Sequence, residues 1–220
     1  MCRVAGVYGY RFAASMVRTL LFAQQHGGQE SCGICVPNFP VKKGLGLVTE
    51  VFPDSQVSQL LPGKCAVGHV RYATQGSVTF DNAAPFEYTT SFGTVFQVHN
   101  GHVINYWELR KFLARKGIGF NGTNDGELLL KLIVWKAEQN GHNLVEAIRY
   151  AMKKVRGAFS IVLIAPDSMY AFRDRYGFRP LVLGKKRKAY FVASETCALD
   201  KCGARYLREV KPGEIVRISK

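Results

Sequence analysis

The sequence predicts an α+β fold, a single domain with two sheets and helices packed outside them. Three observations predict it. Short apolar runs typical of strands fill most of the first hundred residues, three helix starts follow one another between residues 105 and 143, and strand-like runs return after Gly157. Such segregated blocks of strands and helices are typical of α+β proteins. With 220 residues and no linker or internal repeat, the chain fits one domain spanning 1–220.

The first hundred residues are expected to form five strands and one helix. Ser15 is the candidate N-cap of the helix, which ends before the Gly27-Gly28 pair and should therefore span 15–26. Apolar runs place the strands at 3–9, 32–36, 45–52, 65–71 and 93–99.

Three central helices are predicted to begin with the same sequence motif. Asn105, Asn124 and Asn143 each stand three residues before a glutamate, which is the layout of a capping box with asparagine as the cap. The glutamates also place negative charge at the positive end of the helix dipole. We expect the helices to run to about residues 116, 140 and 156, each followed by glycine.

Strands resume after Gly157, and a charged segment at 184–188 is expected to be a hairpin tip. Apolar runs predict the last six strands at 158–165, 169–173, 181–184, 189–194, 205–209 and 214–218.

Composition excludes several classes of protein. Hydrophobic residues make up 47% and charged residues 21% of the chain, which is ordinary globular usage and argues against disorder. No stretch approaches the roughly 18 apolar residues of a membrane span. The N-terminus lacks the basic and then apolar layout of a signal peptide. We therefore expect a cytoplasmic protein without membrane contact.

The net charge is +14 and is unevenly distributed. Residues 1–100 hold 7 basic and 5 acidic side chains, whereas residues 101–220 hold 23 and 11. Such an excess attracts nucleic acid, phosphorylated substrates or an acidic partner. Nucleic acid is the weakest of these interpretations, because no base-stacking or groove-reading motif accompanies the charge.

Six cysteines include the pair Cys32 and Cys35, which has the spacing of half a metal or redox site. The loose spacing of Cys197 and Cys202 does not complete a zinc set. We favour two small buried residues in a strand, and we expect neither a metal nor another cofactor.

Cys2 carries the first indication of chemistry, because removal of Met1 would make it the N-terminal residue. It would then hold a thiol with an ordinary pKa of about 8.5 and an α-amine with one of roughly 7.7–8.0. The amine could serve as the base for its own side chain. Taken alone, the position is explained better by a small residue that happens to follow the initiator methionine.

Further segments supply groups suited to cleaving the amide of a zwitterionic substrate. Arg71 ends a predicted strand and offers a cation for an α-carboxylate, and Asp125 offers an anion for an α-ammonium group. Asn100 and Gly101 end another strand, where an amide and a backbone N–H could form an oxyanion hole. Arg71 lies in segment 68–74, and Asn100 and Gly101 lie in 99–101. Five further segments stand out in the sequence, which are 25–31, 82–86, 172–181, 193–195 and 210–214.

Jointly, these segments resemble class II glutamine amidotransferases, which are N-terminal-nucleophile hydrolases. They are most similar to the glutaminase half of amidophosphoribosyltransferases, enzymes of purine biosynthesis, over nearly the whole chain. The resemblance implies a four-layer αββα sandwich of two mainly antiparallel sheets. It also implies that Cys2 attacks the side-chain amide of L-glutamine, with its α-amine as base and Asn100 and Gly101 as the oxyanion hole.

The resemblance implies the remaining site residues as well. Arg71 would hold the α-carboxylate of glutamine, helped by Tyr72 and the segment of Thr74, and Asp125 would take the α-ammonium group. A thioester would form on Cys2, ammonia would leave, and water would release glutamate.

Two departures from the family pattern stand out. The family usually has arginine where this chain has Gly27, and Ser-Asp-Thr-Glu where this chain has Asn124-Asp125-Gly126-Glu127. Nothing resembles the phosphoribosyltransferase half of the family enzyme. We therefore expect either a separate chain of that type as the acceptor and partner, or a free-standing glutaminase-type domain with another acceptor. A homo-oligomer is left open.

A different class of function competes with this one. The chain could be a non-catalytic paralogue that binds glutamine or a partner chain as a regulatory module. Gly27 and the missing acceptor half motivate that alternative, which turnover of glutamine would eliminate.

Overall fold

The computed structural model describes residues 1–55, 62–73 and 77–219. Within these ranges the larger sheet has the strand order β11-β9-β10-β1-β4-β2-β3, and every neighbouring pair is antiparallel. Its strands are β1 (Arg3–Tyr8), β2 (Ser31–Cys35), β3 (Lys42–Leu45), β4 (Cys65–Arg71), β9 (Val182–Lys186), β10 (Ala189–Ala193) and β11 (Arg205–Glu209).

The smaller sheet has the order β12-β8-β7-β6-β5 and is also antiparallel. Its strands are β5 (Phe86–Thr90), β6 (Gly93–Val103), β7 (Gly157–Ala165), β8 (Ser168–Arg173) and β12 (Ile215–Ser219). The helices are α1 (Ala13–Ala23), α2 (Val48–Val51), α3 (Tyr106–Ala114), α4 (Asp125–Gln139), α5 (Leu144–Lys154) and α6 (Thr196–Lys201), with a 3₁₀ turn η1 (Gln25–Gly27).

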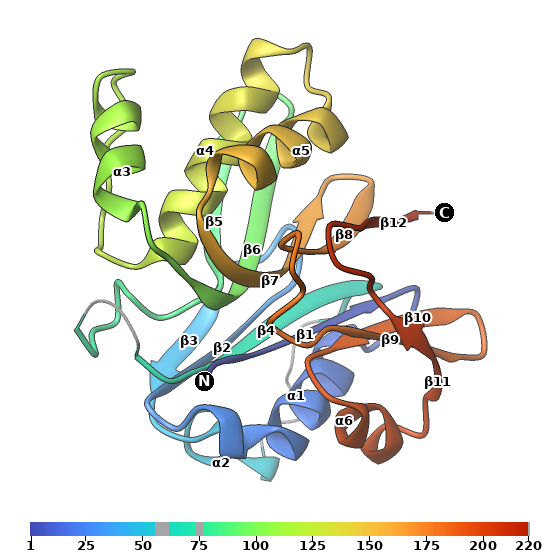
Figure 1. Ribbon diagram of the computed structural model, residues 1–220. Coiled ribbons are helices and arrows are strands. Elements are labelled where there is room, and N and C mark those ends of the chain that lie inside the picture. Colours follow the sequence, from blue (N-terminus) through green and yellow to red (C-terminus); the bar gives the residue numbers. More distant parts are fainter. Residues whose placement is uncertain (56–61, 74–76, 220) are drawn as a thin grey trace.

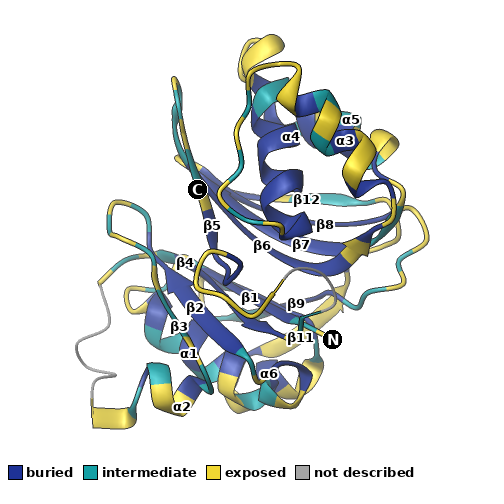
Figure 2. Cartoon of the chain, turned by 90° about the vertical axis from the view of Figure 1, so that its left-hand side faces the viewer, coloured by how far each residue is buried: buried dark blue, intermediate teal, exposed yellow. Residues whose placement is uncertain are grey.

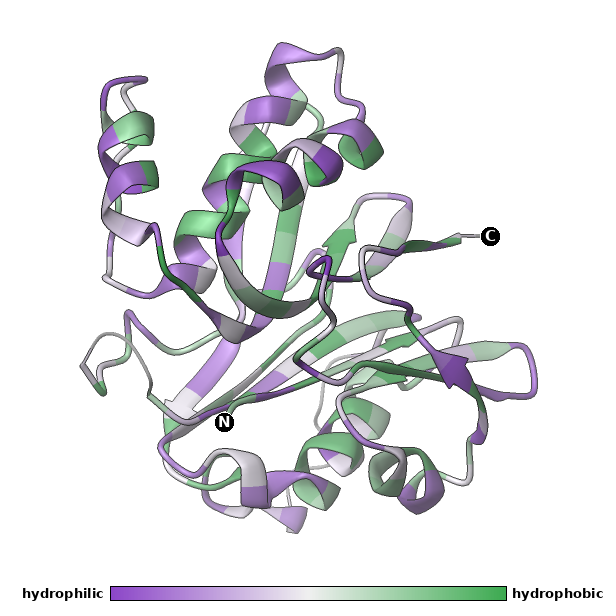
Figure 3. Ribbon diagram, viewed as in Figure 1, coloured by the Kyte–Doolittle hydropathy of each residue, from purple (hydrophilic) through white to green (hydrophobic). Residues whose placement is uncertain are grey.

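The elements stack in four layers, which confirms the predicted αββα sandwich (Figure 1). Helices α3, α4 and α5 cover the outer face of the smaller sheet, and α1, α2 and α6 cover the outer face of the larger one. The central strands are buried, whereas the edge strands β3 and β11 and the outward helix faces are largely exposed (Figure 2). Apolar residues follow the same division, on the strands and on the inward helix faces (Figure 3).

A middle layer of the core lies between the two sheets. Val4 of β1 and Val67 of β4 belong to the same buried cluster as Val98 of β6 and Val162 of β7. Because a strand alternates its side chains between its two faces, the neighbouring residues point outward to the helices. Each sheet therefore has an apolar inner and outer face, as a four-layer sandwich requires.

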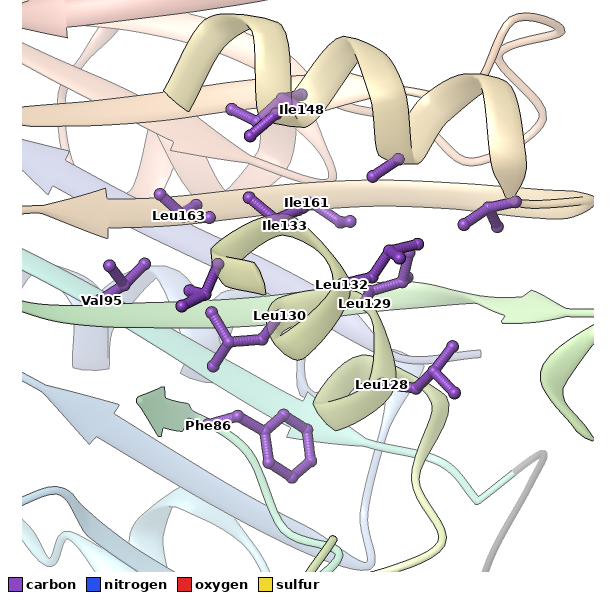
Figure 4. Packing of buried hydrophobic residues seen from close by; sticks show 14 of the residues in the cluster. Phe86, Val95, Leu128, Leu129, Leu130, Leu132, Ile133, Ile148, Ile161 and Leu163 are labelled. Carbon is purple, nitrogen blue, oxygen red and sulfur yellow. The ribbon is translucent and has the colours of Figure 1, made fainter. Parts of the chain in front are cut away.

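Helix α4 is the most deeply buried helix of the described chain, with eleven of its fifteen residues buried. Its leucines and Ile133 pack against Phe86 of β5, Val95 of β6 and strand β7 (Figure 4). Burial of one such apolar side chain contributes about 1.5–3 kcal/mol. The apolar run that begins at Leu128 is thus a buried helix, with its first turn held at the seam between the sheets.

The strand expected at 45–52 is wrong, because Val48–Val51 form helix α2. Glu50 accepts a hydrogen bond from the N–H of Leu47 at 2.6 Å, and Gln25 accepts one from the N–H of Val48 at 2.7 Å. Both contacts satisfy N–H groups that a helix start leaves without partners. The contact from Gln25 is tertiary, so hydrophobic pattern alone does not predict it.

Ser15 does not cap α1, which begins two residues earlier. The carbonyl of Gly63 accepts a hydrogen bond from the N–H of Ala13 at 3.1 Å and takes that role. Residues 25 and 26, expected to be the last two residues of that helix, belong instead to η1 (Gln25–Gly27). Strand β5 and helix α6 are additional elements that the sequence did not predict.

The capping prediction is confirmed in part. Asn124 accepts from the N–H of Gly126 at 2.8 Å, and Asn143 accepts from the N–H of Glu146 at 3.1 Å. Asn105 makes no such bond and instead binds the chain after α5, where it accepts from the N–H of Arg156 at 2.8 Å.

The carboxylate of Glu127 does not bind the backbone N–H of its N-cap residue, Asn124, as a capping box would require. It accepts from the N–H groups of Asn121 and Gly122 and from Lys131 at 2.6 Å. Its carboxylate thus holds the loop before α4 rather than the end of the helix itself.

No helix formed by the described residues is long and apolar enough to cross a membrane.

Candidate active site

The predicted site residues come together at the seam between the two sheets. Cys2 precedes β1, and the pairing of Arg3 with Val70 places it beside Arg71 at the end of β4. Asn100 and Gly101 lie in β6 of the other sheet, and Asp125 is the first residue of α4. Four elements that are distant in sequence thus meet at one point.

A buried hydrogen bond joins the two sheets at this point. Nε2 of His69, on β4, lies 2.8 Å from the carbonyl oxygen of His99, on β6. The carbonyl can only accept, so Nε2 carries the proton and the neutral ring has Nδ1 unprotonated. Burial lowers the pKa of His69 to about 3. The ring is therefore neutral at physiological pH.

A narrow cavity of about 10 Å³ marks the centre of the site. It is lined by Cys2, His69, Arg71, Tyr72, Ala84, Phe86, His99, Gly101, Asn124 and Asp125. A space of this size holds about one water molecule. Of the predicted site residues, Cys2, Arg71, Tyr72, Gly101 and Asp125 thus line one cavity, whereas Asn100 is not among its lining residues.

The thiol of Cys2 is held by the backbone of Tyr72. The N–H of Tyr72 lies 3.4 Å from Sγ, and Sγ lies 3.3 Å from the carbonyl oxygen of Tyr72. Burial raises the pKa of the Cys2 thiol, against the opposing effect of that N–H. Burial also lowers the pKa of the chain's α-amine, which is here on Met1. A thiol that ionises reluctantly needs a base beside it, and after removal of Met1 the α-amine of Cys2 would be that base.

Asn100 has a feature expected of an oxyanion hole. Its side chain is buried, and its amide Nδ2 has no hydrogen-bond partner among the described residues. Buried amide groups are normally paired, so an unpaired donor is suited to receiving a ligand oxygen. Gly101 is required sterically, because a Cβ at this position would lie 2.7 Å from Nε2 of His99 and 2.8 Å from Cα of Phe159.

Asp125 is buried and ionised. Burial raises its pKa, but the His99 ring, with Nδ1 at 3.4 Å, and the N–H of Val103 at 3.0 Å outweigh it and hold the pKa below its usual range. The adjacent Asn124 donates to the carbonyl of Asn82 at 2.9 Å. The segment 82–86 is thereby tied to the start of α4.

Arg71 is almost completely buried, and its Nη1 donates to the carbonyl of Ser77 at 3.0 Å. A guanidinium group inside a cavity is suited to a carboxylate. Tyr72 contributes its backbone to the site, whereas its side chain is 49% exposed. Thr74 lies outside the described residues.

Sequence reasoning assigned no site role to five of the residues that line the cavity, which are His69, Ala84, Phe86, His99 and Asn124, nor to Arg3. His69 and Phe86 line the cavity, although both lie in segments that carried the resemblance. Arg3, next to Cys2, donates to the backbone carbonyls of Met1 and Cys2. Its position beside the candidate nucleophile was the available signal.

Cys32 and Cys35 are two buried residues of a strand, β2, which is the interpretation that the sequence analysis favoured. Among the described residues, no three histidine, cysteine or carboxylate side chains form a group that could hold a metal ion.

The fold and the position of Cys2 together define a class. A four-layer sandwich with a cysteine at the start of a central strand, facing the seam between its sheets, is the arrangement of N-terminal-nucleophile hydrolases.

Within that class, the chain belongs to the glutamine amidotransferase domain family, whose model it matches over residues 69–201. It is 43% identical, over all of its length and 39% of the relative's, to amidophosphoribosyltransferase 2, chloroplastic, of Arabidopsis thaliana. It is 37% identical to the amidophosphoribosyltransferase of Methanocaldococcus jannaschii, over 99% of this chain and 47% of the relative.

The structure is similar to that of the glutamine phosphoribosylpyrophosphate amidotransferase of B. subtilis complexed with ADP and GMP. The TM-score is 0.89 at 37% identity, over 99% of this chain and 47% of the other. The chain thus spans less than half the length of these relatives.

Proposed function

We propose that this chain is a glutaminase domain over residues 1–220, which hydrolyses the side-chain amide of L-glutamine and delivers ammonia to an acceptor site. The observation that carries the proposal is the gathering of Cys2, Arg71, Gly101 and Asp125 around one cavity. These groups are a nucleophile, a cation, a backbone donor and an anion. A zwitterionic amide substrate needs all four.

The catalytic sequence uses Cys2 after removal of Met1. Its α-amine takes the thiol proton, and Sγ attacks the amide carbon of glutamine. Negative charge then develops on the amide oxygen, where Nδ2 of Asn100 and the N–H of Gly101 stabilise it. The carbon–nitrogen bond breaks, the amine returns its proton to the leaving nitrogen, and ammonia departs from a thioester. Water, deprotonated by the same amine, releases glutamate.

Substrate recognition follows from charge. Arg71 binds the α-carboxylate, and Asp125, held ionised, binds the α-ammonium group. Hydrogen bonds between charged groups are about twice as strong as neutral ones. Tyr72 positions the thiol through its backbone, and Thr74 is proposed to assist Arg71. No cofactor takes part in the proposed reaction.

Release of glutamate from glutamine tests the proposal, on protein whose intact mass shows that Met1 has been removed. We expect turnover by the wild type and none by Cys2→Ala. Cys65→Ala is the matched control, because Cys65 pairs with Tyr8 at the opposite end of the same two strands. Turnover that survives Cys2→Ala, or full activity with Met1 retained, would overturn the assignment of the nucleophile.

Asp125→Asn separates binding from chemistry. We expect the KM for glutamine to rise at least tenfold, because an ion pair to the substrate is lost. A glutamine-induced rise in melting temperature without any turnover would favour the regulatory alternative instead.

We propose a phosphoribosyltransferase-type chain as the acceptor and partner, since the relatives are named for that transfer. A groove of about 980 Å³ supports this interpretation. It begins at His102, next to Gly101, and exposes Tyr176 and Phe178. Its cationic side chains are Arg149, Lys153, Arg156, Arg175 and Arg217. An apolar groove rimmed by cations suits a partner with acidic residues around an apolar centre.

When a tagged form of this chain is purified from the organism that encodes it, the partner should co-purify and should raise the glutaminase rate. The variant Phe178→Asp should no longer retain the partner. Glutaminase activity without partner should be unchanged in that variant. A co-purifying phosphoribosyltransferase that Phe178→Asp retains would place the interface elsewhere. A cytoplasmic location, expected from the sequence, remains part of the proposal.

A further inference from the structure

We propose that Arg3 replaces the arginine that the family pattern carries at residue 27, and that its guanidinium positions the nucleophile Cys2 from strand β1. The proposal rests on the proposed function. It explains physically why residue 27 is glycine in this chain. It also assigns a positioning role to Arg3, which lies outside the substrate cavity.

The space around Gly27 is filled by Arg3. A Cβ at position 27 would lie 2.5 Å from Cγ, 2.8 Å from Nε and 2.7 Å from Cζ of Arg3. Real side chains do not approach so closely, so any residue larger than glycine would displace the Arg3 side chain. An arginine at 27 and the observed Arg3 therefore compete for the same volume.

The guanidinium of Arg3 is fully engaged where it lies. Nη1 donates to the carbonyls of Met1 and Cys2, at 3.1 Å each, and Nε donates to Glu195 at 2.6 Å. Nη2 also contacts the Glu195 carboxylate. The bond to the carbonyl of Cys2 does not depend on Met1, so it remains after Met1 is removed.

Glu195, the residue before α6, anchors the other side of this clamp. Burial raises its pKa, but the Arg3 guanidinium and the ring of His26 outweigh burial and hold the pKa below its usual range. His26 lies 2.8 Å from the same carboxylate and directly precedes Gly27. The clamp thus joins η1, the start of α6 and the backbone of Cys2.

Positioning follows from these contacts. Cys2 lies before the first paired residue of β1, and a free N-terminus frays unless it is tied down. The Arg3 clamp fixes the carbonyl of Cys2, and the backbone of Tyr72 fixes its thiol. Two fixed points define the direction in which Sγ and the α-amine face the cavity. Arg3 does not line that cavity, so it should affect kcat and leave glutamine binding unchanged.

The test is a four-protein cycle on the full chain without Met1: wild type, Arg3→Ala, Gly27→Arg and the double variant. Alanine removes all three Arg3 atoms that oppose a Cβ at 27. We expect Arg3→Ala to lower kcat about 10- to 100-fold, the range for losing a hydrogen bond to a charged group. The KM for glutamine should stay within about twofold.

The double variant should recover kcat to within about fivefold of wild type, because the guanidinium returns from position 27. Gly27→Arg alone should be impaired and should melt at a lower temperature, since both arginines are then present. Arg208→Ala is the matched control, because it removes a guanidinium from a different carboxylate pair, Arg208–Glu214, on the edge strand β11. It should leave kcat unchanged.

Unchanged kcat in Arg3→Ala, or a double variant no better than Arg3→Ala, would overturn the proposal. If Arg3→Ala does not fold, Arg3→Lys serves in its place, since one ammonium group cannot reproduce both the bond to the carbonyl of Cys2 and the two contacts to the Glu195 carboxylate. If the wild type shows no glutaminase activity, the proposed function fails separately. The same cycle is then decided by melting temperature and by the rate at which iodoacetamide alkylates Cys2, both of which the double variant should restore.

Discussion

Replacing His69 by glutamine should remove a pH dependence from the stability of the fold. His69 is buried in the hydrogen bond that joins the two sheets, and its pKa in the folded protein is about 3. In the unfolded chain a histidine has a pKa of about 6.5. Below that value the unfolded state binds a proton that the folded state does not bind. The folded state therefore loses stability as the pH falls through 6.5, and the loss ends near the folded pKa.

The magnitude follows from proton linkage. Between pH 7 and pH 5 this histidine alone should lower the free energy of unfolding by about 2 kcal/mol. At pH 5 the folded ring is still neutral, so the figure is set by the protonation of the unfolded chain. The acidic groups contribute little in this window. Asp125, Glu127 and Glu195 have lowered pKa values in the folded state, so their stabilisation is present at pH 5 and is lost at lower pH.

Urea denaturation at pH 7 and pH 5, followed by circular dichroism, measures the effect. Glutamine at 69 can still donate to the carbonyl of His99 but cannot be protonated. The wild type should lose about 2 kcal/mol more than His69→Gln over this range. His102→Gln, at an exposed position of β6, is the matched control and should behave like the wild type. Equal pH slopes in the wild type and His69→Gln would refute the reasoning.

Two further predictions concern stability. Glu127→Gln should lower the free energy of unfolding by about 3 kcal/mol, because it breaks a buried ion pair with Lys131. Urea denaturation at pH 7 measures this change. A loss of only about 0.5 kcal/mol, as for an exposed ion pair, would contradict the prediction. Gly101→Ala should cost about 2 kcal/mol by overpacking between His99 and Phe159, measured by thermal melting. Gly119→Ala, where a Cβ meets nothing within 4 Å, is its control, and equal melting temperatures for the two variants would argue against the steric explanation.

Much of the fold was predictable because hydrophobic periodicity is a local property. Strands β1, β4, β7 and β10 lie where apolar runs placed them, and helices α4 and α5 lie where their capping residues and following glycines placed them, within a few residues. Helix α2 was missed because Gln25, distant in sequence, satisfies its first N–H group. Strand β5 was missed because only Phe86 at its start is buried, while its remaining residues are partly or fully exposed.

Most of the substrate-facing residues of the site were predictable from the sequence, but the contacts that hold them in place were not. The family pattern singled out Cys2, Arg71, Gly101 and Asp125, and the structure brings all four to one cavity. It gave no role to His69, because the bond from His69 to His99 crosses between two sheets and depends on how they stack. The relation between Gly27 and Arg3 was hidden for a similar reason. Both residues were visible in the sequence, but only the fold shows that they share one volume.

The seam between the sheets has a consequence for how tightly glutamine is held. Cys2 and Arg71 belong to one sheet, whereas Gly101 and Asp125 belong to the other sheet and its helix, and the space between them is about 10 Å³. A whole amino acid fits only in molecules in which the lining side chains or the layers that carry them have moved apart there. If such molecules make up about 1% of the population, the apparent dissociation constant is about 100-fold weaker than the contacts alone would give. A protein that docks across both layers and holds them open would then sharpen the affinity for glutamine without touching it.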